Sequence, residues 1–590
     1  MTQGRVTGIV ANLIFIEAEG PVKQNEICLI ESDGKQMMAE VIRLSGSQVS
    51  AQLFESGITI AMNSLVTFTG SMLEVELGPG ILSKRFDGLQ NDLSKMEGLF
   101  IEAGDTTAPL DEDVVYKFTP LAKVGDRVEA GHWLGSVMEN WIDHKIMAPF
   151  TLEGEYTIKT LVEEGSHKIS DAIAVLTSSS GEEVSVTMKQ KWPVKLAVDI
   201  YKKKMRPHQL LQTGLRVIDT LNPIAEGGTG YIPGPFGTGK TVLQQAIAKN
   251  SQTDIVIIVA CGERANEVVE IFTEFPQLVD TKGHPLDEKI TIICNTSNMP
   301  VAAREASVYV GMTLAEYYRC MGLKVLMLAD STSRWAQALR EMSNRMEELP
   351  GPDAFPVELP STIANFYSRA GIVELNNGET GSVTFIGTVS PAGGNFKEPV
   401  TESTSKVARC FYALSQKRAD AKRYPAIDPL ASYSKYLEYP EFIKNTNTTI
   451  QEGWTELVTR AKDTVRTGLE VRDQINILGD DAVPVEYHIS FWKSELIDFA
   501  LIQQDSFDDI DMNAPMERQK YMLNKVMDIC DQNFDFEDFE ATAAFFKKLI
   551  NLLRQMNYSE FDSDSFKQYE QTVNEEVAAH SNEQVTLKEA

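Results

Sequence analysis

The sequence contains no long apolar run. Hydrophobic residues make up 43% of the 590 residues, yet no run approaches the roughly 18–20 residues that a helix needs to cross a bilayer. The segment from Met1 to Val6 has no basic stretch followed by an apolar one, so a signal peptide is not predicted. We therefore expect a soluble protein, which could serve a membrane process only by docking onto other subunits.

Closely spaced cysteines and clustered histidines are also lacking. The six cysteines lie far apart along the chain, and the seven histidines form no HExxH-like motif. Because zinc centres and redox CxxC sites need such spacing, we expect no structural transition metal. Isolated cysteines within apolar runs behave as small hydrophobic residues, which fits a reducing compartment.

Basic residues are scarce relative to acidic ones. Lysine and arginine total 55 against 84 aspartates and glutamates, which gives a formal net charge of -29 at pH 7. An acidic surface repels the phosphate backbones of nucleic acids and the headgroups of anionic lipids, although the same charge also serves solubility. The composition therefore disfavours nucleic acid as a partner unless a local basic channel exists.

Composition and periodicity divide the chain into five parts and predict a multidomain α/β protein. Residues 1–70 show short apolar runs bounded by turn residues, which predict an N-terminal β-barrel. A connector punctuated by glycine and proline covers 71–110, and a β-rich insert covers 111–189. Residues 190–435 alternate buried strands with amphipathic stretches, as a parallel sheet covered by helices does. Residues 436–590 carry a helical period.

The insert contains a segment, Val124 to Leu134, that is similar to the hairpins of lipoyl-type and biotinyl-type folds. Such a hairpin raises the alternative of a carrier lysine, for which Lys145 is the candidate. Lys145 does not lie in a Met-Lys-Met or Asp-Lys-Ala tip. The sequence therefore favours a structural β-module over a carrier domain.

One motif carries most of the functional information. The segment Gly-Pro-Phe-Gly-Thr-Gly-Lys-Thr matches G-x-x-x-x-G-K-[ST], the phosphate-binding loop. Its glycines permit backbone angles at which successive N–H groups converge on phosphate oxygens. Lys240 places a charge between the β- and γ-phosphates, the Thr241 hydroxyl can ligate Mg²⁺, and a helix from near Val242 aims its positive end at the anion. The residues predicted to bind nucleotide here are Gly234, Pro235, Phe236, Gly237, Thr238, Gly239, Lys240, Thr241 and Val242.

Two carboxylates are expected beside this loop. Glu263 ends the apolar strand that begins near Asp254, and Asp330 ends the strand 325–329. Because ligands lie at the carboxyl ends of parallel strands, Glu263 is predicted to polarise the attacking water and Asp330 to hold Mg²⁺. The alternatives are structural, with Glu263 as an acid in the first turn of the next helix and Asp330 as a helix cap.

Two arginines, Arg264 and Arg334, closely follow these acids. Each could neutralise the charge of a γ-phosphate. Each could instead hold the neighbouring acids in place through fork-shaped hydrogen bonds. The sequence leaves both interpretations open.

Together these motifs resemble the catalytic A subunit of vacuolar-type and archaeal-type rotary ATPases, including the bacterial members. The resemblance can be followed in order from residue 1 to about residue 510, and it is most specific at 295–305 and 329–336. The phosphate loop, the segment 213–219 ahead of it and the segment 262–267 also match. The insert is similar to the bulge domain that distinguishes A subunits.

The resemblance implies further residue roles. Glu263, Lys240 and Arg264 correspond to catalytic positions, with Glu263 as the carboxylate that activates water. Tyr424 looks like the aromatic residue that stacks on adenine, with Gln504 and Phe507 at the same edge. These three and Arg334 join the nucleotide-binding set, and Thr241 and Asp330 form the metal set.

The resemblance also implies an architecture and a set of partners. A β-barrel, a bulge, a RecA-like core and a helical domain are expected, in a ring where three copies alternate with three non-catalytic B subunits that supply an arginine finger in trans. Central and peripheral stalks would connect this ring to a membrane sector that the chain contacts only indirectly. ATP would be the substrate and Mg²⁺ the cofactor, at the cytoplasmic face of a membrane across which H⁺ or Na⁺ moves.

Two other functional classes are alternatives. A non-catalytic nucleotide-binding module of the same ring tends to lack the combination of Lys240 and Glu263. A RecA-like hexameric motor for secretion or nucleic-acid translocation would share the core. The acidic balance and the lack of a basic, aromatic-rich loop argue against a nucleic-acid motor. The β-rich insert argues against both a nucleic-acid motor and a secretion motor.

Overall fold

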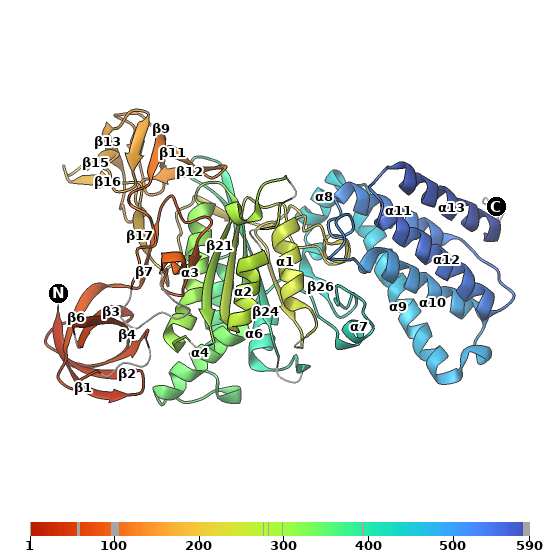
Figure 1. The fold of residues 1–590 in the computed structure, drawn as a ribbon, viewed down its shortest axis with the longest axis horizontal. Coiled ribbons are helices and arrows are strands. Elements are labelled where there is room, and N and C mark those ends of the chain that lie inside the picture. The colour runs from red at the N-terminus through yellow and green to blue at the C-terminus, as the bar shows by residue number, and fades with distance from the viewer. Residues whose placement is uncertain are drawn as a thin grey trace.

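The computed structural model describes residues 2–32, 34–55, 60–95, 106–235, 237–274, 277–280, 282–297, 299–391 and 394–581. The molecule is elongated, with a β-barrel at one end, a helical bundle at the other and a sheet-based core between them (Figure 1). The β-rich insert projects from the core on the same side as the barrel. The predicted fold class is confirmed.

The N-terminal strands close into a barrel in the order β1-β2-β5-β4-β3-β6. Inward side chains such as Ile14 and Ile16 alternate with exposed ones, which is the period of a strand with one buried face. The barrel strands are β1 (Gln3–Val10), β2 (Leu13–Ala18), β3 (Glu26–Ser32), β4 (Lys35–Ser45), β5 (Gln48–Leu53) and β6 (Leu65–Met72).

The segment expected as a connector contributes strands to two sheets. β7 (Glu74–Leu77) pairs antiparallel with β17 (Gln190–Pro193), and β8 (Arg85–Phe86) pairs parallel with β21 (Ile290–Thr296) at the edge of the core sheet. Strands of two to four residues are too short to show a period in the sequence. The connector is therefore structurally tied to both the insert and the core.

The insert consists of two four-stranded sheets, ordered β10-β13-β15-β16 and β12-β11-β9-β14. Lys145 lies within β12 rather than at the tip of the β11–β12 hairpin. Its ammonium pairs with Asp143 and lies 5.2 Å from the ring centroid of Trp133, a geometry that agrees with the structural interpretation. The strands are β9 (Val115–Pro120), β10 (Arg127–Val128), β11 (Trp133–Glu139), β12 (Ile142–Met147), β13 (Tyr156–Leu161), β14 (Gly165–Lys168), β15 (Ala174–Ser178) and β16 (Glu183–Val186).

The core sheet has the order β26-β25-β19-β24-β22-β20-β21-β8, and its central strands are parallel. Alternate residues of β20 face two different hydrophobic clusters, one shared with α3 and one with α1. This explains why the strand is a continuous apolar run instead of an alternating one. The remaining strands are β18 (Lys203–Met205), β19 (Thr229–Pro233), β20 (Ile255–Glu263), β22 (Lys324–Asp330), β23 (Gly371–Glu374), β24 (Thr380–Val389), β25 (Cys410–Phe411) and β26 (Tyr433–Ser434).

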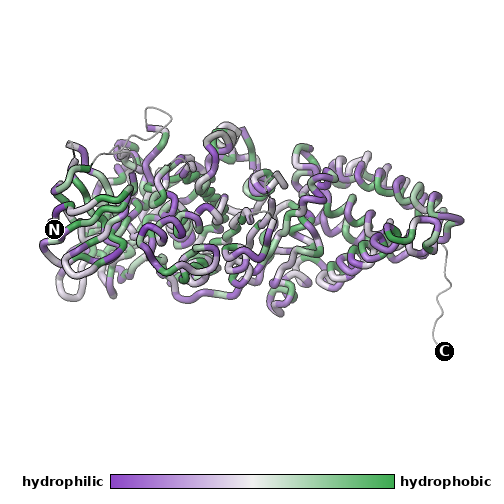
Figure 2. The backbone as a smooth tube through the Cα atoms, turned by 90° about the horizontal axis from the view of Figure 1, so that it is seen from below, coloured by the Kyte–Doolittle hydropathy of each residue, from purple (hydrophilic) through white to green (hydrophobic). Residues whose placement is uncertain are grey.

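Helices flank this sheet and then form the C-terminal bundle. Hydrophobic and hydrophilic stretches alternate along the bundle helices (Figure 2), as expected where one stripe of each helix packs inward. Among the described residues, no helix combines the length and the apolar character that a membrane crossing demands. The core helices are α1 (Lys240–Asn250), α2 (Ala265–Glu274), α3 (Val301–Arg319), α4 (Thr332–Arg345), α5 (Leu359–Ser368), α6 (Pro399–Val407) and α7 (Gln416–Asp420). The bundle helices are α8 (Pro440–Thr449), α9 (Trp454–Leu478), α10 (Val485–Ile497), α11 (Met516–Asp531), α12 (Phe539–Asn557) and α13 (Asp564–His580).

A buried ion cluster connects the barrel to the core. Lys195 Nζ lies 2.7 Å from a carboxylate oxygen of Glu40 on β4 and 3.5 Å from one of Glu305 on α3. Both carboxylates are almost fully buried, and burial raises the pKa of Glu305. The single ammonium therefore offsets two charges that water cannot reach.

The substitution Lys195→Met is expected to destabilise the protein. It leaves two buried carboxylates without a cation, which should lower the free energy of unfolding by about 3 kcal/mol in chemical denaturation. Lys168→Met is the matched control, because Lys168 pairs with Asp113 on the exposed surface of the insert. Equal effects of the two substitutions would contradict the role of the buried cluster.

Candidate functional site

The phosphate-loop segment connects the end of β19 to the start of α1. Gly237 and Gly239 both have a positive φ, at 82° and 86°, which residues with a Cβ rarely adopt. Gly239 caps α1 in this left-handed conformation, so the helix begins at Lys240, two residues earlier than the expected start near Val242. Phe236, predicted to bind nucleotide, lies outside the described residues.

The loop folds around the Lys240 side chain. The ammonium donates hydrogen bonds to the carbonyls of Gly234 at 2.8 Å and Pro235 at 3.0 Å. The hydroxyl of Thr238 donates to the same Pro235 carbonyl at 2.8 Å. Burial lowers the pKa of Lys240, whereas the charges of Asp330 and Glu263 raise it. The lysine thus lies at the centre of the loop, with acids nearby.

Asp330 joins three elements at the carboxyl edge of the sheet. It is the last residue of β22, and its carboxylate is buried. One carboxylate oxygen accepts a 2.6 Å hydrogen bond from the Thr388 hydroxyl on β24, and the other accepts one at 3.3 Å from Thr241 in the first turn of α1. The structure therefore brings the two predicted metal ligands, Thr241 and Asp330, together.

Glu263 is the last residue of β20 and precedes α2, which begins at Ala265. It lines the same small cavity as Thr241, Asp330 and a further acid, Glu267. The pKa of Glu263 is raised to about 8, first by burial and then by the charge of Asp330 and a hydrogen bond with Glu267, while the charge of Arg334 opposes them. Three carboxyl groups thus gather next to one lysine, and this excess of acid can be balanced by a cation.

The two predicted arginines follow the strand ends that carry Glu263 and Asp330. Arg264 directly follows Glu263, between β20 and α2. Arg334 lies in the first turn of α4, where it donates a 3.0 Å hydrogen bond to Gln337. A Cβ at Gly262 would lie 2.9 Å from the Cβ of Arg334, so glycine lets the end of β20 approach α4. The roles of both arginines towards a phosphate remain predictions.

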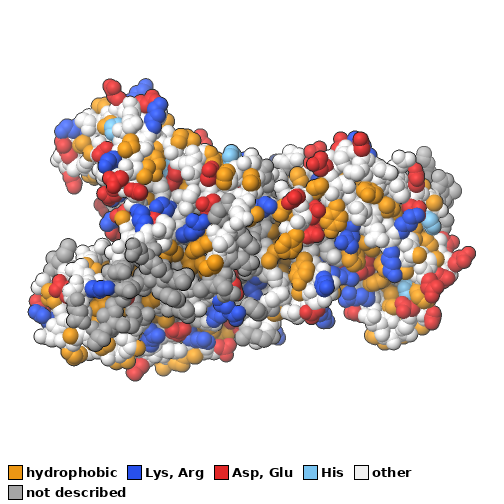
Figure 3. Space-filling view, viewed as in Figure 1, with side chains coloured by type: hydrophobic (Ala, Val, Ile, Leu, Met, Phe, Trp, Pro, Cys, Tyr) orange, Lys and Arg blue, Asp and Glu red, His pale blue; other side chains and the backbone are white. Residues whose placement is uncertain are grey.

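A cavity of about 570 Å³ extends from the phosphate loop to the helical domain. Gly237, Thr238, Gly239 and Val242 line one side. Figure 3 shows hydrophobic side chains gathered on one face at the junction between the core and the helical domain. A polar loop at one end and apolar walls at the other suit a molecule with an anionic head and a flat apolar part.

The three residues predicted at the adenine edge all line this cavity. Tyr424 is 43% exposed, and its ring would lie 3.8 Å from a Cβ placed at Gly239. Phe507 is 88% exposed at the other side of the cavity. Both rings are therefore accessible in the cavity, and the Tyr424 ring lies next to the phosphate loop.

Gln504 lines the cavity at the predicted edge, but its amide is engaged by the protein. Its side chain is buried, and its amide is hydrogen-bonded within the protein. The oxygen accepts from Arg216 N at 2.9 Å, and the nitrogen donates to the carbonyls of Gly214 at 2.9 Å and Asp511 at 2.7 Å. These contacts hold the cavity wall in place, and the role of Gln504 towards a nucleotide stays a prediction.

Sequence reasoning missed two polar residues of the site. Thr388 orients Asp330, and its signal was its place near the end of the apolar run 383–389, because ligands gather at the ends of parallel strands. Glu267 raises the pKa of Glu263, and its signal was only a spacing of four residues from that acid. Neither residue type is informative without its neighbours in space.

Three family models match the chain. The nucleotide-binding domain of the ATP synthase alpha/beta family matches residues 214–434, its barrel-sandwich domain matches 107–195, and its beta-barrel domain matches 6–70. Among solved structures, the ATPase EscN of the enteropathogenic E. coli type III secretion system aligns with a TM-score of 0.61 at 20% identity, covering 89% of this chain and 99% of EscN. At that identity, the likeness shows the fold alone.

Curated relatives match over nearly the full length. The V-type ATP synthase alpha chain of Borreliella afzelii (strain PKo) is 48% identical over 580 residues, which cover 98% of this chain and 99% of the relative. The V-type ATP synthase alpha chain of Treponema denticola is 47% identical over 581 residues, which cover 98% and 96%. The chain therefore belongs to the ATP synthase alpha/beta family, among the V-type ATP synthase alpha chains.

Proposed function

We propose that this chain is the catalytic, ATP-hydrolysing subunit of a rotary V/A-type ATPase, which couples hydrolysis or synthesis of ATP to the transport of H⁺ or Na⁺ across a membrane. One observation carries the catalytic part of the proposal. The Glu263 carboxyl lines the same cavity as Thr241 and Asp330, next to the phosphate loop. The charge of Glu263 raises the pKa of Lys240 in that loop. Full-length relatives named V-type ATP synthase alpha chains support the rotary part.

The phosphate loop positions the triphosphate in this proposal. Backbone N–H groups of the loop and the first turn of α1 point to the anion, where the helix dipole adds to their attraction. Lys240 exchanges its two carbonyl partners, Gly234 and Pro235, for phosphate oxygens. Because the loop is preorganised, the charge that develops in the transition state meets fixed donors.

The residues near Thr241 fit a magnesium ion. A hydroxyl and a carboxylate within hydrogen-bonding reach of each other are hard oxygen donors, which Mg²⁺ prefers. The carboxyl groups near Lys240 outnumber it, so their negative charge attracts such a cation. Bound Mg²⁺ supplies charge neutralisation at the phosphate oxygens. Thr388 holds the Asp330 carboxylate in one orientation for this purpose.

Glu263 is the proposed proton acceptor for the attacking water. Burial and the charge of Asp330 raise its pKa in the chain alone. With Mg²⁺ offsetting the charge of Asp330, the Glu263 carboxyl would ionise more readily and could accept the proton of the water. Arg264 and Arg334 follow the two strand ends and are placed to offset negative charge near the terminal phosphate. In-line attack then needs only that the water be held between Glu263 and the phosphorus atom.

The proposed assembly completes the site. Three copies of this chain alternate with three non-catalytic B subunits, which supply an arginine finger in trans. Central and peripheral stalks link this ring to a membrane sector, and the ring lies at the cytoplasmic face. The elongated shape of the chain, with a β-barrel at one end and a helical bundle at the other, suits parallel packing around an axis (Figure 1).

The substitution Glu263→Gln is expected to stop turnover and spare binding. The amide keeps the shape of the side chain but cannot accept the proton, so steady-state hydrolysis should fall by about a thousandfold while ATP affinity stays within about threefold. Glu267→Gln is the matched control, because it removes the neighbouring acid, and it should keep at least about a tenth of the turnover. Turnover that survives in Glu263→Gln would rule this glutamate out as the proton acceptor.

The substitution Thr388→Val tests the metal assignment. It removes the hydrogen bond to Asp330 at nearly constant volume, and the Mg²⁺ concentration that half-saturates Mg-dependent ATP binding should rise about tenfold. Thr384→Val is the control, because Thr384 is a buried threonine of the same strand that accepts a hydrogen bond from Gly227 N. An unchanged Mg²⁺ dependence in Thr388→Val would show that Asp330 does not serve the metal.

Replacement of Tyr424 tests the base end of the cavity. Tyr424→Ala removes a stacking face and should raise the KM for ATP about tenfold with little change in kcat, because base–aromatic stacking contributes about 1–3 kcal/mol. Tyr424→Phe keeps the face and should behave as the unmodified protein does. A KM that is the same in the alanine variant would place the base elsewhere.

A further inference from the structure

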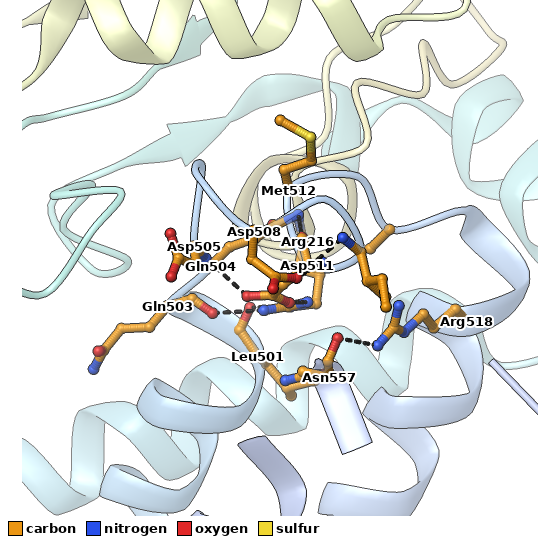
Figure 4. Close-up of polar contacts among 12 residues, drawn as sticks. Arg216, Leu501, Gln503, Gln504, Asp505, Asp508, Asp511, Met512, Arg518 and Asn557 are labelled. Atoms are coloured by element: carbon orange, nitrogen blue, oxygen red, sulfur yellow. Dashed lines mark hydrogen bonds and ion pairs between the residues drawn. The ribbon is translucent and has the colours of Figure 1, made fainter. Parts of the chain in front are cut away.

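A buried arginine connects the core to the helical domain beside the nucleotide cavity. Arg216 precedes the short π-helical turn Val217–Leu221, and its side chain is 1% exposed. Its guanidinium donates to the carbonyls of Leu501 at 3.2 Å and Gln503 at 2.6 Å, and to the Asp511 carboxylate at 2.5 Å (Figure 4). Three points of the helical-domain segment 501–511 are thus held by one side chain of the core.

The same segment is closed upon itself by Asp511. The second carboxylate oxygen of Asp511 accepts a hydrogen bond from Asp505 N at 2.8 Å, and Asp508 accepts one from Asp511 N at 2.7 Å. Gln504 adds the contacts to Arg216 N and Gly214 O described above. The loop Gln503–Phe507 is therefore held by the Arg216–Asp511 pair together with the contacts of Gln504.

The core side of this junction is fixed independently. Buried Asp219 accepts hydrogen bonds from the backbone of Thr213 and Gly214, both at 2.9 Å, and from the side chain of Gln519 on α11 at 2.8 Å. Asn250, the last residue of α1, donates to the Met512 carbonyl at 2.8 Å. The helix that begins at the phosphate loop is thus tied at its far end to the chain that leaves the 501–511 segment.

Residues Gln503 to Phe507 form a wall of the nucleotide cavity together with Tyr424. Gly237, Thr238 and Gly239 of the phosphate loop line another part of that cavity. A group that fixes this wall acts on the base end of a bound nucleotide and leaves the phosphate end untouched. Arg216 itself does not line the cavity, whereas Asp511 does, so Arg216 acts through Asp511 and the loop.

We propose that Arg216, through its ion pair with Asp511, is a positioning residue that sets the base-side wall of the nucleotide cavity and so ties occupation by the base to the position of the helical domain. This inference rests on the proposed nucleotide-binding function. Both side chains of the pair are buried, with 1% of Arg216 and 5% of Asp511 exposed. Loss of the guanidinium therefore leaves its hydrogen-bond acceptors without a partner, because water cannot reach them. The loop then samples positions in which the wall is not formed.

The expected loss of ATP affinity follows from the fraction of molecules in which residues 503–507 form the cavity wall. If a variant forms this wall in about a tenth of its molecules, the apparent dissociation constant for ATP rises about tenfold. A ligand that has phosphates but no base does not contact the wall, so its affinity should stay unchanged. Inorganic tripolyphosphate is such a ligand, and the ratio of the two affinities separates a positioning effect from general loosening.

The experiment compares ATP and tripolyphosphate binding to the full chain, by displacement of a fluorescent nucleotide in the presence of Mg²⁺. Arg216→Lys keeps the positive charge but loses the planar guanidinium that donates to three acceptors. Asp511→Asn is a milder variant, because it keeps the side-chain shape and removes only the negative charge. Arg369→Lys is the matched control, because Arg369 is a buried arginine that donates to Glu316 and to a backbone carbonyl, far from the cavity lining. Amide hydrogen exchange of residues 503–511 reports the loop position without any ligand.

The proposal expects both junction variants to bind ATP about tenfold more weakly, to bind tripolyphosphate as the unmodified chain does, and to exchange the 503–511 amides faster. Equal weakening of both ligands, unchanged ATP affinity, or the same behaviour in Arg369→Lys would overturn it. An unmodified chain that binds neither ligand would instead overturn the proposed function.

Discussion

The parallel register of β20 against β22 is the constraint on which the site depends. It places Ala260 opposite Asp330, so both strands end at the same edge of the sheet and Glu263 extends just beyond. Both strands are buried on both faces, which fixes this register, because a slip of one residue would exchange the side chains that face the two cores. The acids are thus brought together by apolar packing that runs the length of the sheet.

The same packing explains the unusual electrostatics of the site. Carboxyl groups at Glu263, Glu267 and Asp330 share a region from which water is largely excluded, and Lys240 is the lysine next to them. Burial raises the pKa values of Glu263 and Asp330 and lowers that of Lys240. Burial therefore disfavours the charged form of each group, which is the form that water favours. The proposed magnesium–triphosphate ligand fits these charges, because a divalent cation would offset the acids and the phosphates would offset Lys240.

The phosphate end of the site was predictable because its information is local. The glycines of the loop, Lys240 and the acids at the ends of apolar runs each follow from short stretches of sequence, and the structure places them at one edge. The N-terminal barrel and the helical bundle follow from their periods for the same reason. The start of α1 was misplaced by two residues because Gly239 caps the helix in a left-handed conformation, which the periodicity of apolar residues does not reveal.

The base end was less predictable because it depends on contacts across long stretches of chain. Arg216 and Asp511 lie 295 residues apart, and nothing local to either indicates the other. Gln504 was assigned by resemblance to an adenine edge, whereas its amide holds the junction between domains. β8 joins the core sheet through only two residues, too few for a pattern, and Thr388 gains its meaning only next to Asp330.

The central claim, that Glu263 readies the attacking water, is tested most directly by a structure of the assembled complex with Mg²⁺, ADP and a planar aluminium fluoride that stands in for the transferring phosphoryl group. The account predicts a water in line with the aluminium and a Glu263 carboxylate oxygen at about 2.6–3.2 Å from that water. A Glu263 carboxylate turned away from the water, with another group in its place, would contradict the account.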